Sequence, residues 1–242
     1  MATTIHLIRH GQAAFGSADY DDLSELGREQ SRLLGAALTP LMGEGDIAIC
    51  GGMRRHRQTA EECLQAMAQA EKTSPSPASG RGVGVRADER WNEFDHAQII
   101  ARHNPVYTDH ARMVTELSAQ SNPRRAFQSL FAAAMTRWCS GDFDSDYSET
   151  WPAFQSRCLA AVQAAAEASN GASNVWIFTS GGPIAAVVQQ LLEISNAQAM
   201  RLSWTLVNAS VSQLHVARGG VRLSTFNGHA HLYGREGLIT YR

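Results

Sequence analysis

Residues 4–12 read TIHLIRHGQ, in which an apolar, β-branched run changes abruptly to an arginine, a histidine and a glycine. The run over residues 4–9 predicts a short buried strand. Two similar junctions occur later in the chain, where strands predicted over residues 46–52 and 174–180 lead into arginines and glycines. We therefore expect three strands that each end in polar or glycine-rich sequence.

The sequence around these junctions predicts an α/β fold. Apolar residues spaced for helices follow the strands over 26–40, 54–71, 150–169 and 181–193, and residues 211–217 and 221–226 predict a hairpin. Strands that alternate with helices favour a three-layer α/β/α sandwich with a mainly parallel sheet and an antiparallel edge. Over about 96–150 the pattern is helical, with Asn122 and Pro123 as a helix start, and we expect a helical cap inserted into a single domain over 1–242.

Composition limits the classes of partner. The chain has 242 residues, 44% of them hydrophobic, and a net charge of −2, which favours one large domain and gives no support for nucleic acid or an anionic membrane as partner. The four cysteines lack the spacing of a zinc site. We expect no metal and no cofactor, and the short apolar start of the chain favours a cytoplasmic location.

The three strand ends together suit a phosphoryl group. Ligands of open α/β sheets bind at the carboxyl ends of the strands, which here bring Arg9, His10 and Arg55 to one edge. Guanidinium groups pair with phosphate oxygens, and the helix start at Gly181 offers backbone N–H groups to an anion.

The motifs occur in an order that resembles the histidine phosphatase superfamily, which includes the cofactor-dependent phosphoglycerate mutases. They are LIRHGQ (7–12), LSELGREQ (23–30), RHRQTA (55–60), WNEFDH (91–96) and NGHAHL (227–232), and they extend over nearly the whole chain. The resemblance implies that His10 attacks phosphorus and becomes a phosphohistidine. It implies that Arg9 and Arg55 hold the phosphoryl oxygens and that Glu93 serves as acid and base. Residues expected to bind phosphate or substrate are Gln12, Ser24, Ser180 and Gly181.

One position departs from the family pattern. The resemblance leads us to expect a second histidine after the strand over 174–180, and Ser180 stands there. A serine hydroxyl cannot carry the charge of an imidazolium, and losing such a donor costs roughly 2.7–4 kcal/mol, or about 100- to 1,000-fold in rate. His96 is the first candidate to compensate and His56 the second, although either is equally read as a half-exposed helix histidine.

The sequence therefore predicts a phosphatase for a small phosphate ester, with two alternatives. A phosphate-binding sensor would retain the pocket without turnover. A phosphoglycerate mutase is the weaker alternative, because residues 12–22 replace the segment that follows Arg-His-Gly in the glycolytic mutases. Within the predicted cap, four side chains are candidates for contacting a second anionic group, or else form a solvated helix face: Arg102, His103, Arg124 and Arg125.

Overall fold

The structure is a computed structural model that describes residues 3–14, 21–73, 84–169 and 171–241. The chain divides into two compact units. The first unit combines Met1–Glu93 with Arg157–Arg242, and the second is Phe94–Ser156. The insertion predicted over 96–150 falls within the second unit.

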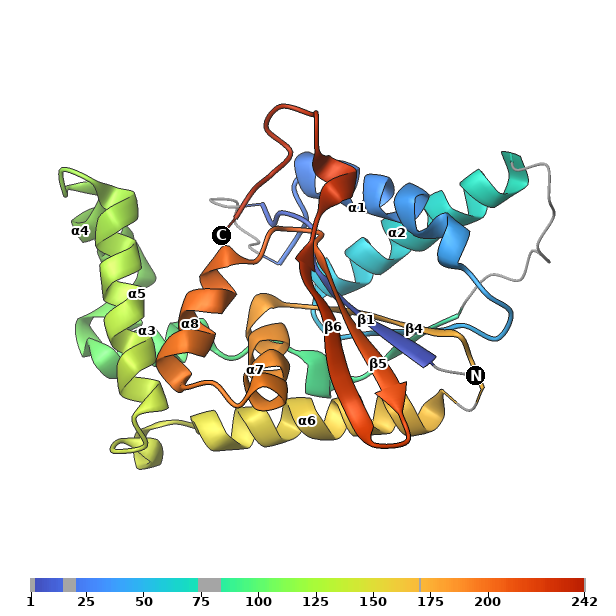
Figure 1. Cartoon of the computed structure of the whole chain (residues 1–242). Coiled ribbons are helices and arrows are strands. Elements are labelled where there is room, and N and C mark those ends of the chain that lie inside the picture. The colour runs from blue at the N-terminus through green and yellow to red at the C-terminus, as the bar shows by residue number, and fades with distance from the viewer. Residues whose placement is uncertain (1–2, 15–20, 74–83, 170, 242) are drawn as a thin grey trace. The chain divides into compact units, whose positions relative to one another are not determined.

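The first unit is built on one mixed sheet with the strand order β3-β2-β4-β1-β5-β6 (Figure 1). The strands are β1 (Thr3–Arg9), β2 (Ile47–Cys50), β3 (Val85–Ala87), β4 (Asn174–Thr179), β5 (Val211–Ala217) and β6 (Gly220–Gly228). The first four run parallel to one another, while β5 pairs antiparallel with both β1 and β6. The predicted parallel sheet with an antiparallel edge is confirmed.

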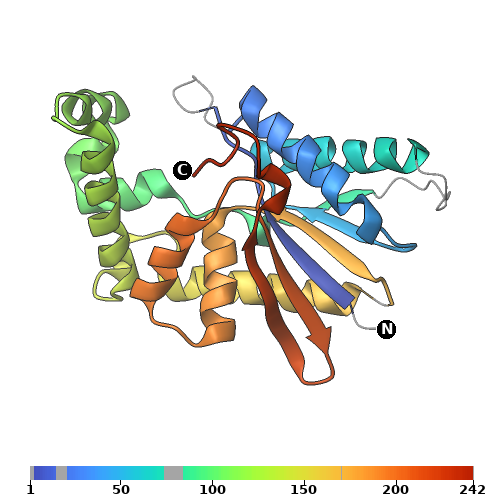
Figure 2. The same ribbon diagram turned by 45° about the horizontal axis from the view of Figure 1, so that its top comes forward.

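Helices cover both faces of this sheet. α1 (Glu25–Leu38) and α2 (Arg54–Thr73) lie on one face, and α6 (Trp151–Ala168) and α7 (Gly181–Leu192) lie on the other (Figures 1 and 2). The layered α/β class is thereby confirmed. A further helix, α8 (Asn196–Thr205), packs against α7 and was not predicted from the sequence.

The core follows from the two-residue alternation of the central strands. Ile8 of β1 and Trp176 and Phe178 of β4 pack on the α1 and α2 side, together with buried residues of both helices. Ile5 and Leu7 point to the opposite face and have no exposed surface. Burial on both faces fixes the register of β1 and β4, and this register determines which residues meet at the strand ends.

The second unit is helical, with α3 (His96–His103), α4 (His110–Ser118) and α5 (Pro123–Cys139). Asn122 caps α5 by accepting a hydrogen bond from the Arg125 backbone N–H, and Pro123 occupies the first turn, as predicted. Aromatic rings hold the unit together: the Trp138 ring lies 5.0 Å from that of Phe94 and 5.2 Å from that of Trp151. Across the described ranges of the chain, every helix is too short or too polar to cross a membrane.

Candidate active site

The carboxyl ends of three neighbouring strands meet at one edge of the sheet. β1 runs parallel to β4, and β4 runs parallel to β2. The residues that follow these strands are therefore neighbours: His10 after β1, Gly51 after β2 and Ser180 after β4. The backbone N–H of His10 donates to the Thr179 carbonyl at 2.8 Å, which joins two of these ends directly. Sheets of this kind bind ligands at this edge.

The His10 ring is buried and oriented by its own loop. Its Nδ1 lies 2.7 Å from the carbonyl oxygen of Gly11. A carbonyl oxygen only accepts hydrogen bonds, so Nδ1 carries the hydrogen and Nε2 retains its lone pair. Burial, and then the positive charges of Arg55 and Arg9, hold the pKa of His10 well below its usual range. The ring is therefore neutral at neutral pH, with Nε2 available as a nucleophile.

Close backbone packing fixes the loop that carries His10. A Cβ on Gly11 would lie less than 3.0 Å from the Gly27 carbonyl of α1, so only glycine fits there. The Gly11 N–H donates to Thr59 Oγ1 at 3.1 Å, and the Thr59 hydroxyl donates to the Arg55 carbonyl at 2.7 Å. The loop is thus tied to both α1 and the first turns of α2.

Two almost fully buried guanidinium groups act on His10. Arg9, at the end of β1, donates from Nη1 to the Leu206 carbonyl oxygen. Arg55, in the first turn of α2, places its Nη1 2.7 Å from Oδ1 of Asp21. The Asp21 carboxylate thus lies on a guanidinium that the sequence predicts to hold phosphate. Asp21 itself was not predicted from the sequence, since it lies in a loop without periodic pattern.

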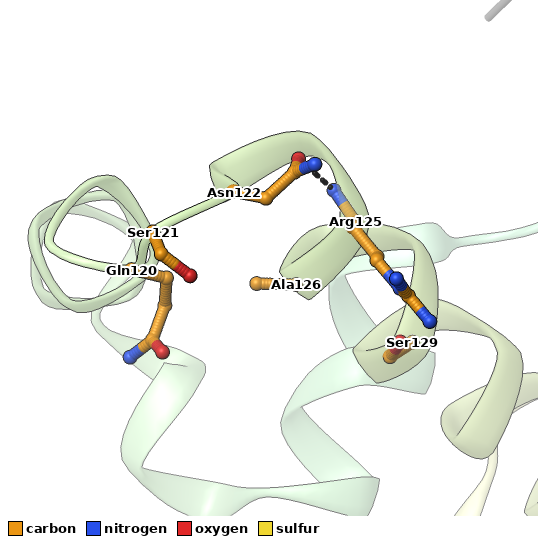
Figure 3. A pocket seen from close by; sticks show the side chains of 6 residues that line it. All are labelled: Gln120, Ser121, Asn122, Arg125, Ala126 and Ser129. Atoms are coloured by element: carbon orange, nitrogen blue, oxygen red, sulfur yellow. Dashed lines mark hydrogen bonds between the residues drawn. The ribbon is translucent and has the colours of Figure 1, made fainter.

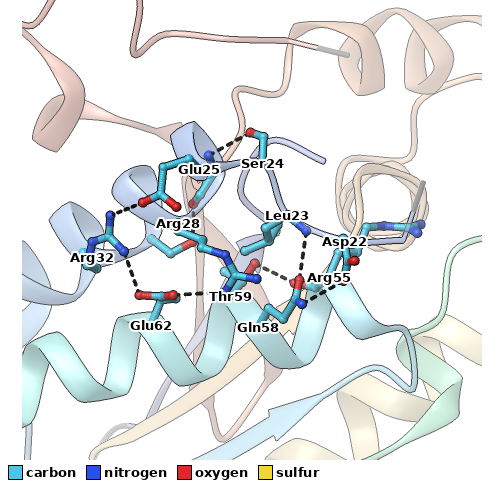
Figure 4. A network of polar contacts seen from close by, with 12 residues as sticks. Asp22, Leu23, Ser24, Glu25, Arg28, Arg32, Arg55, Gln58, Thr59 and Glu62 are labelled. Atoms are coloured by element: carbon cyan, nitrogen blue, oxygen red, sulfur yellow. Dashed lines mark hydrogen bonds and ion pairs between the residues drawn. The ribbon is translucent and has the colours of Figure 1, made fainter. Parts of the chain in front are cut away.

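A polar network holds the start of α2 against the segment that precedes α1 (Figure 4). Asp22 accepts hydrogen bonds from Gln58 at 2.9 Å and from the Arg54 side chain at 3.1 Å. Gln58 in turn accepts from the Leu23 backbone N–H at 2.8 Å. These contacts position the turn of α2 from which Arg55 extends.

Ser180 contacts a histidine that comes from a different element. Its Oγ lies 2.6 Å from Nε2 of His56, in the first turn of α2, and neither residue has exposed surface. The His56 ring centroid is 5.8 Å from that of His10. Burial, and then the charge of Arg55, keep the pKa of His56 well below its usual range, so this ring is also neutral.

Of the two histidines considered as compensating residues, His56 is the one that contacts Ser180. His96 belongs to the second unit, where its half-buried ring lies 4.4 Å from the Phe94 ring and 5.7 Å from the Phe131 ring. Aromatic packing accounts for its burial there. The sequence favoured His96 because it follows Glu93 closely, and a compensating role for His96 stays a prediction.

Glu93 lies at the start of α7. Its Oε2 accepts a hydrogen bond from the Gly182 backbone N–H at 3.2 Å, and the residue is 9% exposed. Gly181 is the first residue of the same helix, and a Cβ there would be 3.8 Å from Nε of Arg9. The partial positive charge of a helix N-terminus favours a carboxylate or a phosphoryl group at this position.

Gln12 and Ser24, predicted to bind phosphate or substrate, are hydrogen-bonded to each other. The Ser24 hydroxyl donates to Gln12 Oε1 at 3.0 Å and accepts from the Gly27 backbone N–H at 3.1 Å as the N-cap of α1. The backbone N–H of Gln12 donates to Gln30 Oε1 at 2.9 Å. In this structure the pair links the His10 loop to the start of α1.

Asn208 also supports the site, although it was not predicted from the sequence. Its Nδ2 lies 3.3 Å from the carbonyl oxygen of His10, and its Oδ1 accepts from the Thr240 hydroxyl at 3.0 Å. The next backbone N–H, that of Ala209, also donates to the His10 carbonyl, at 3.2 Å. An asparagine shortly before a predicted strand is a turn signal that could have drawn attention to it.

The side chains predicted to contact a second anionic group all lie on exposed helix positions of the second unit: Arg102, His103, Arg124 and Arg125. Arg125 lines a shallow hollow together with Gln120, Ser121, Asn122, Ala126 and Ser129 (Figure 3). A role for these residues in substrate binding stays a prediction. In the part of the chain that the structure describes, no group of three or more His, Cys, Asp or Glu side chains is placed to hold a metal ion.

Comparison with known proteins places these observations in a family. The sequence profile of the histidine phosphatase superfamily (branch 1) matches residues 5–229. None of the curated protein sequences matches the chain. Among solved structures, the phosphoglycerate mutase of Bacillus anthracis is similar with a TM-score of 0.62 and 17% identity, over 96% of this chain and 95% of that one.

Two phosphatase structures are similar to the same degree. One is a mycobacterial glucosyl-3-phosphoglycerate phosphatase, with a TM-score of 0.60 and 21% identity over 94% of this chain and all (100%) of that one. The other is a mutant phosphoserine phosphatase from Entamoeba histolytica in complex with phosphoserine, with a TM-score of 0.61 and 17% identity over 95% and 99% of the two chains. At these identities the likeness shows a shared fold.

Proposed function

Because this chain belongs to the histidine phosphatase superfamily (branch 1), we propose that it is a phosphatase that hydrolyses a small phosphate ester through a phosphohistidine at His10. One observation carries most of the proposal: the 2.7 Å contact between His10 Nδ1 and the Gly11 carbonyl, which leaves the Nε2 lone pair unprotonated. The lowered pKa of His10 and the neighbouring guanidinium groups support the same role.

The proposed reaction has two displacements at phosphorus. In the first, Nε2 of His10 forms a bond to phosphorus as the bond to the ester oxygen breaks, and Glu93 gives its proton to the departing oxygen. In the second, water attacks the phosphohistidine, Glu93 takes a proton from that water, and the N–P bond breaks to release inorganic phosphate. Arg9 and Arg55 offset the negative charge on the phosphoryl oxygens in both steps.

We propose a small phosphorylated molecule in the cytoplasm as substrate. The names of the structural neighbours include a glucosyl-3-phosphoglycerate phosphatase and a phosphoserine phosphatase, which favours this class. The net charge of −2 favours it over a polyanion such as nucleic acid. The four basic side chains of the second unit remain candidates for a second anionic group of the substrate.

The test is hydrolysis of p-nitrophenyl phosphate from pH 5 to 8 by the native chain, a His10→Ala variant and a His215→Ala control. His215 is an exposed histidine of β5 on the same sheet. We expect His10→Ala to lose more than about 1,000-fold in kcat/KM and His215→Ala to retain native activity. Alkaline denaturation after incubation with a labelled phosphodonor preserves the acid-labile N–P bond and should trap label on the native chain and none on His10→Ala.

Two outcomes would overturn the proposal. Unlabelled native protein that still binds inorganic phosphate would favour the sensor. Undiminished hydrolysis by His10→Ala would place the nucleophile elsewhere. Since the pKa of His10 is held well below its usual range, the acid limb of kcat/KM due to this ring should lie below pH 6.5.

A further inference from the structure

The Ser180 hydroxyl has an unusual environment for a residue that precedes a helix. Ser180 is the N-cap of α7, yet its side chain accepts no hydrogen bond from the first turn of that helix. Within the described residues, its hydrogen-bond partner is Nε2 of His56, at 2.6 Å. Since both side chains are fully buried, the direction of this hydrogen bond determines what the hydroxyl can do.

Gly51 determines which nitrogen of His56 carries the hydrogen. His56 Nδ1 is buried and has no hydrogen-bond partner among the described residues. A Cβ on Gly51 would lie less than 3.0 Å from Nδ1, so a Cα hydrogen of Gly51 faces this nitrogen directly. If Nδ1 carries a lone pair, it can accept this Cα hydrogen in a weak C–H···N contact. If Nδ1 carried a hydrogen, that hydrogen would face the Cα hydrogen and would have no acceptor.

The hydrogen of the neutral His56 ring is therefore on Nε2, and it is donated to Ser180 Oγ. This leaves the hydroxyl hydrogen of Ser180 to be donated elsewhere, and the described residues offer it no acceptor. Ser180 follows β4 directly, as His10 follows the adjacent strand β1. An oxygen of a phosphoryl group on His10 would supply the missing acceptor.

Building on the function proposed above, we propose that Ser180 is a catalytic residue that donates a hydrogen bond to the phosphoryl group, with His56 and Gly51 as its positioning residues. His56 polarises the hydroxyl and fixes its rotamer, and Gly51 fixes the tautomer of His56. The donor is neutral, and its hydrogen remains on oxygen throughout both displacements. The positive charge at the phosphoryl group then comes from Arg9 and Arg55.

The experiment measures p-nitrophenyl phosphate hydrolysis and orthovanadate affinity in a set of matched variants. We expect Ser180→Ala and His56→Ala each to lower kcat/KM by about 100-fold, and the double variant to lose little more because the two residues act as one unit. His56→Gln, whose amide nitrogen replaces Nε2 as donor, should stay within about 10-fold of the native chain. Orthovanadate imitates the five-coordinate phosphoryl group, so its affinity should fall in parallel.

The Gly51→Ala variant tests the position of the His56 ring without removing the ring. The added methyl would displace the His56 ring, so we expect about the loss seen in His56→Ala. Added to His56→Ala, the same exchange should cost much less, because the ring it displaces is absent and the closest remaining neighbour of the new Cβ is the Trp91 carbonyl oxygen at 3.0 Å. The matched control is Gly52→Ala, whose Cβ would meet its nearest neighbour in ordinary contact at 3.4 Å. Thermal unfolding checks that each variant is folded.

Additive losses in the double variant, or native orthovanadate affinity in folded Ser180→Ala, would overturn the inference. So would a loss from Gly51→Ala that is equally large with and without the His56 ring. These results are distinguishable from failure of the proposed function, which would appear as a native chain without phosphoenzyme. In that case orthovanadate affinity, which needs no turnover, still decides whether Ser180 and His56 bind the phosphoryl group together.

Discussion

At the scale of single residues, Asp21 is placed to compete with the phosphoryl group of the proposed substrate. Its carboxylate lies 2.7 Å from Arg55 Nη1 and accepts a further hydrogen bond from the Arg54 backbone N–H, also at 2.7 Å. A phosphoryl group that uses the same edge of Arg55 must displace a carboxylate of like charge. We therefore expect Asp21 to raise the concentration at which an anion fills the site.

We predict that Asp21→Asn strengthens inhibition by inorganic phosphate. The Asp21 side chain is 34% exposed, so the pair contributes roughly 0.5–1 kcal/mol and its removal should lower the Ki by roughly 2- to 5-fold. The measurement is competitive inhibition at pH 7. Glu25→Gln is the control, since the exposed Glu25 pairs with Arg32 and has no contact with Arg55 among the described residues. A higher Ki in Asp21→Asn would mean instead that Asp21 orients Arg55 for binding.

The sequence predicts the position of a site residue well when that residue directly follows a strand. His10 and Arg9 belong to a strand that ends in polar sequence, so their place at the sheet edge follows from the fold. The contact of His56 with Ser180 joins residues 124 positions apart. It depends on the direction of a buried ring next to Gly51, and no periodicity in the sequence encodes that direction.

At the scale of elements, α1 and α2 approach each other through Gly35. A Cβ at this position would lie less than 3.0 Å from the Cys63 carbonyl of α2, so the two helix backbones approach each other closely there. Alanine is favoured over glycine in a helix by about 1 kcal/mol. In Gly35→Ala the steric overlap opposes this gain in helix propensity. Because backbone atoms must move to relieve the overlap, we expect its cost to exceed the gain.

We therefore expect Gly35→Ala to lower the free energy of unfolding by about 1–3 kcal/mol. Urea denaturation followed by circular dichroism measures the change. Ala36→Gly, on the exposed face of the same helix, is the control and should show only the propensity loss of about 1 kcal/mol. A more stable Gly35→Ala protein would show that α1 and α2 can separate without loss.

One element escaped prediction although its signal is in the sequence. α8 begins after Ser195, which forms a capping box with Gln198: the serine side chain accepts from the Gln198 N–H, and the glutamine side chain accepts from the Ser195 N–H. Ser-x-x-Gln before a helix is a recognised start signal. The segment lacks a strong apolar stripe, since Ala199 is its one buried residue, and so periodicity alone did not mark it.

At the scale of the whole molecule, buried neutral histidines link stability to pH. Burial lowers the pKa of His6, His10 and His56, and it lowers the pKa of His231 to about 4. The unfolded chain binds protons at these positions as the pH falls through about 6.5, and the folded chain does so only at lower pH. The stability from neutral burial is fully present above pH 6.5 and is lost on acidification.

We predict that the free energy of unfolding falls steadily from pH 6.5 to pH 4. Each histidine that is protonated only in the unfolded state contributes up to about 1.4 kcal/mol per pH unit. Urea denaturation at half-unit intervals measures the slope. His231→Gln should reduce the slope between pH 6.5 and about 4. A flat profile would contradict the neutral burial of these rings.

The Ser180–His56 contact also has a consequence for descent. Both side chains are fully buried at 2.6 Å from each other, so an imidazole at position 180 would need the volume that His56 already fills. A histidine therefore fits at position 180 only if position 56 carries a smaller residue. We therefore expect a relative that carries histidine after the fourth strand to carry a smaller residue at the position of His56, and an alignment of the family would test this by the covariation of the two positions.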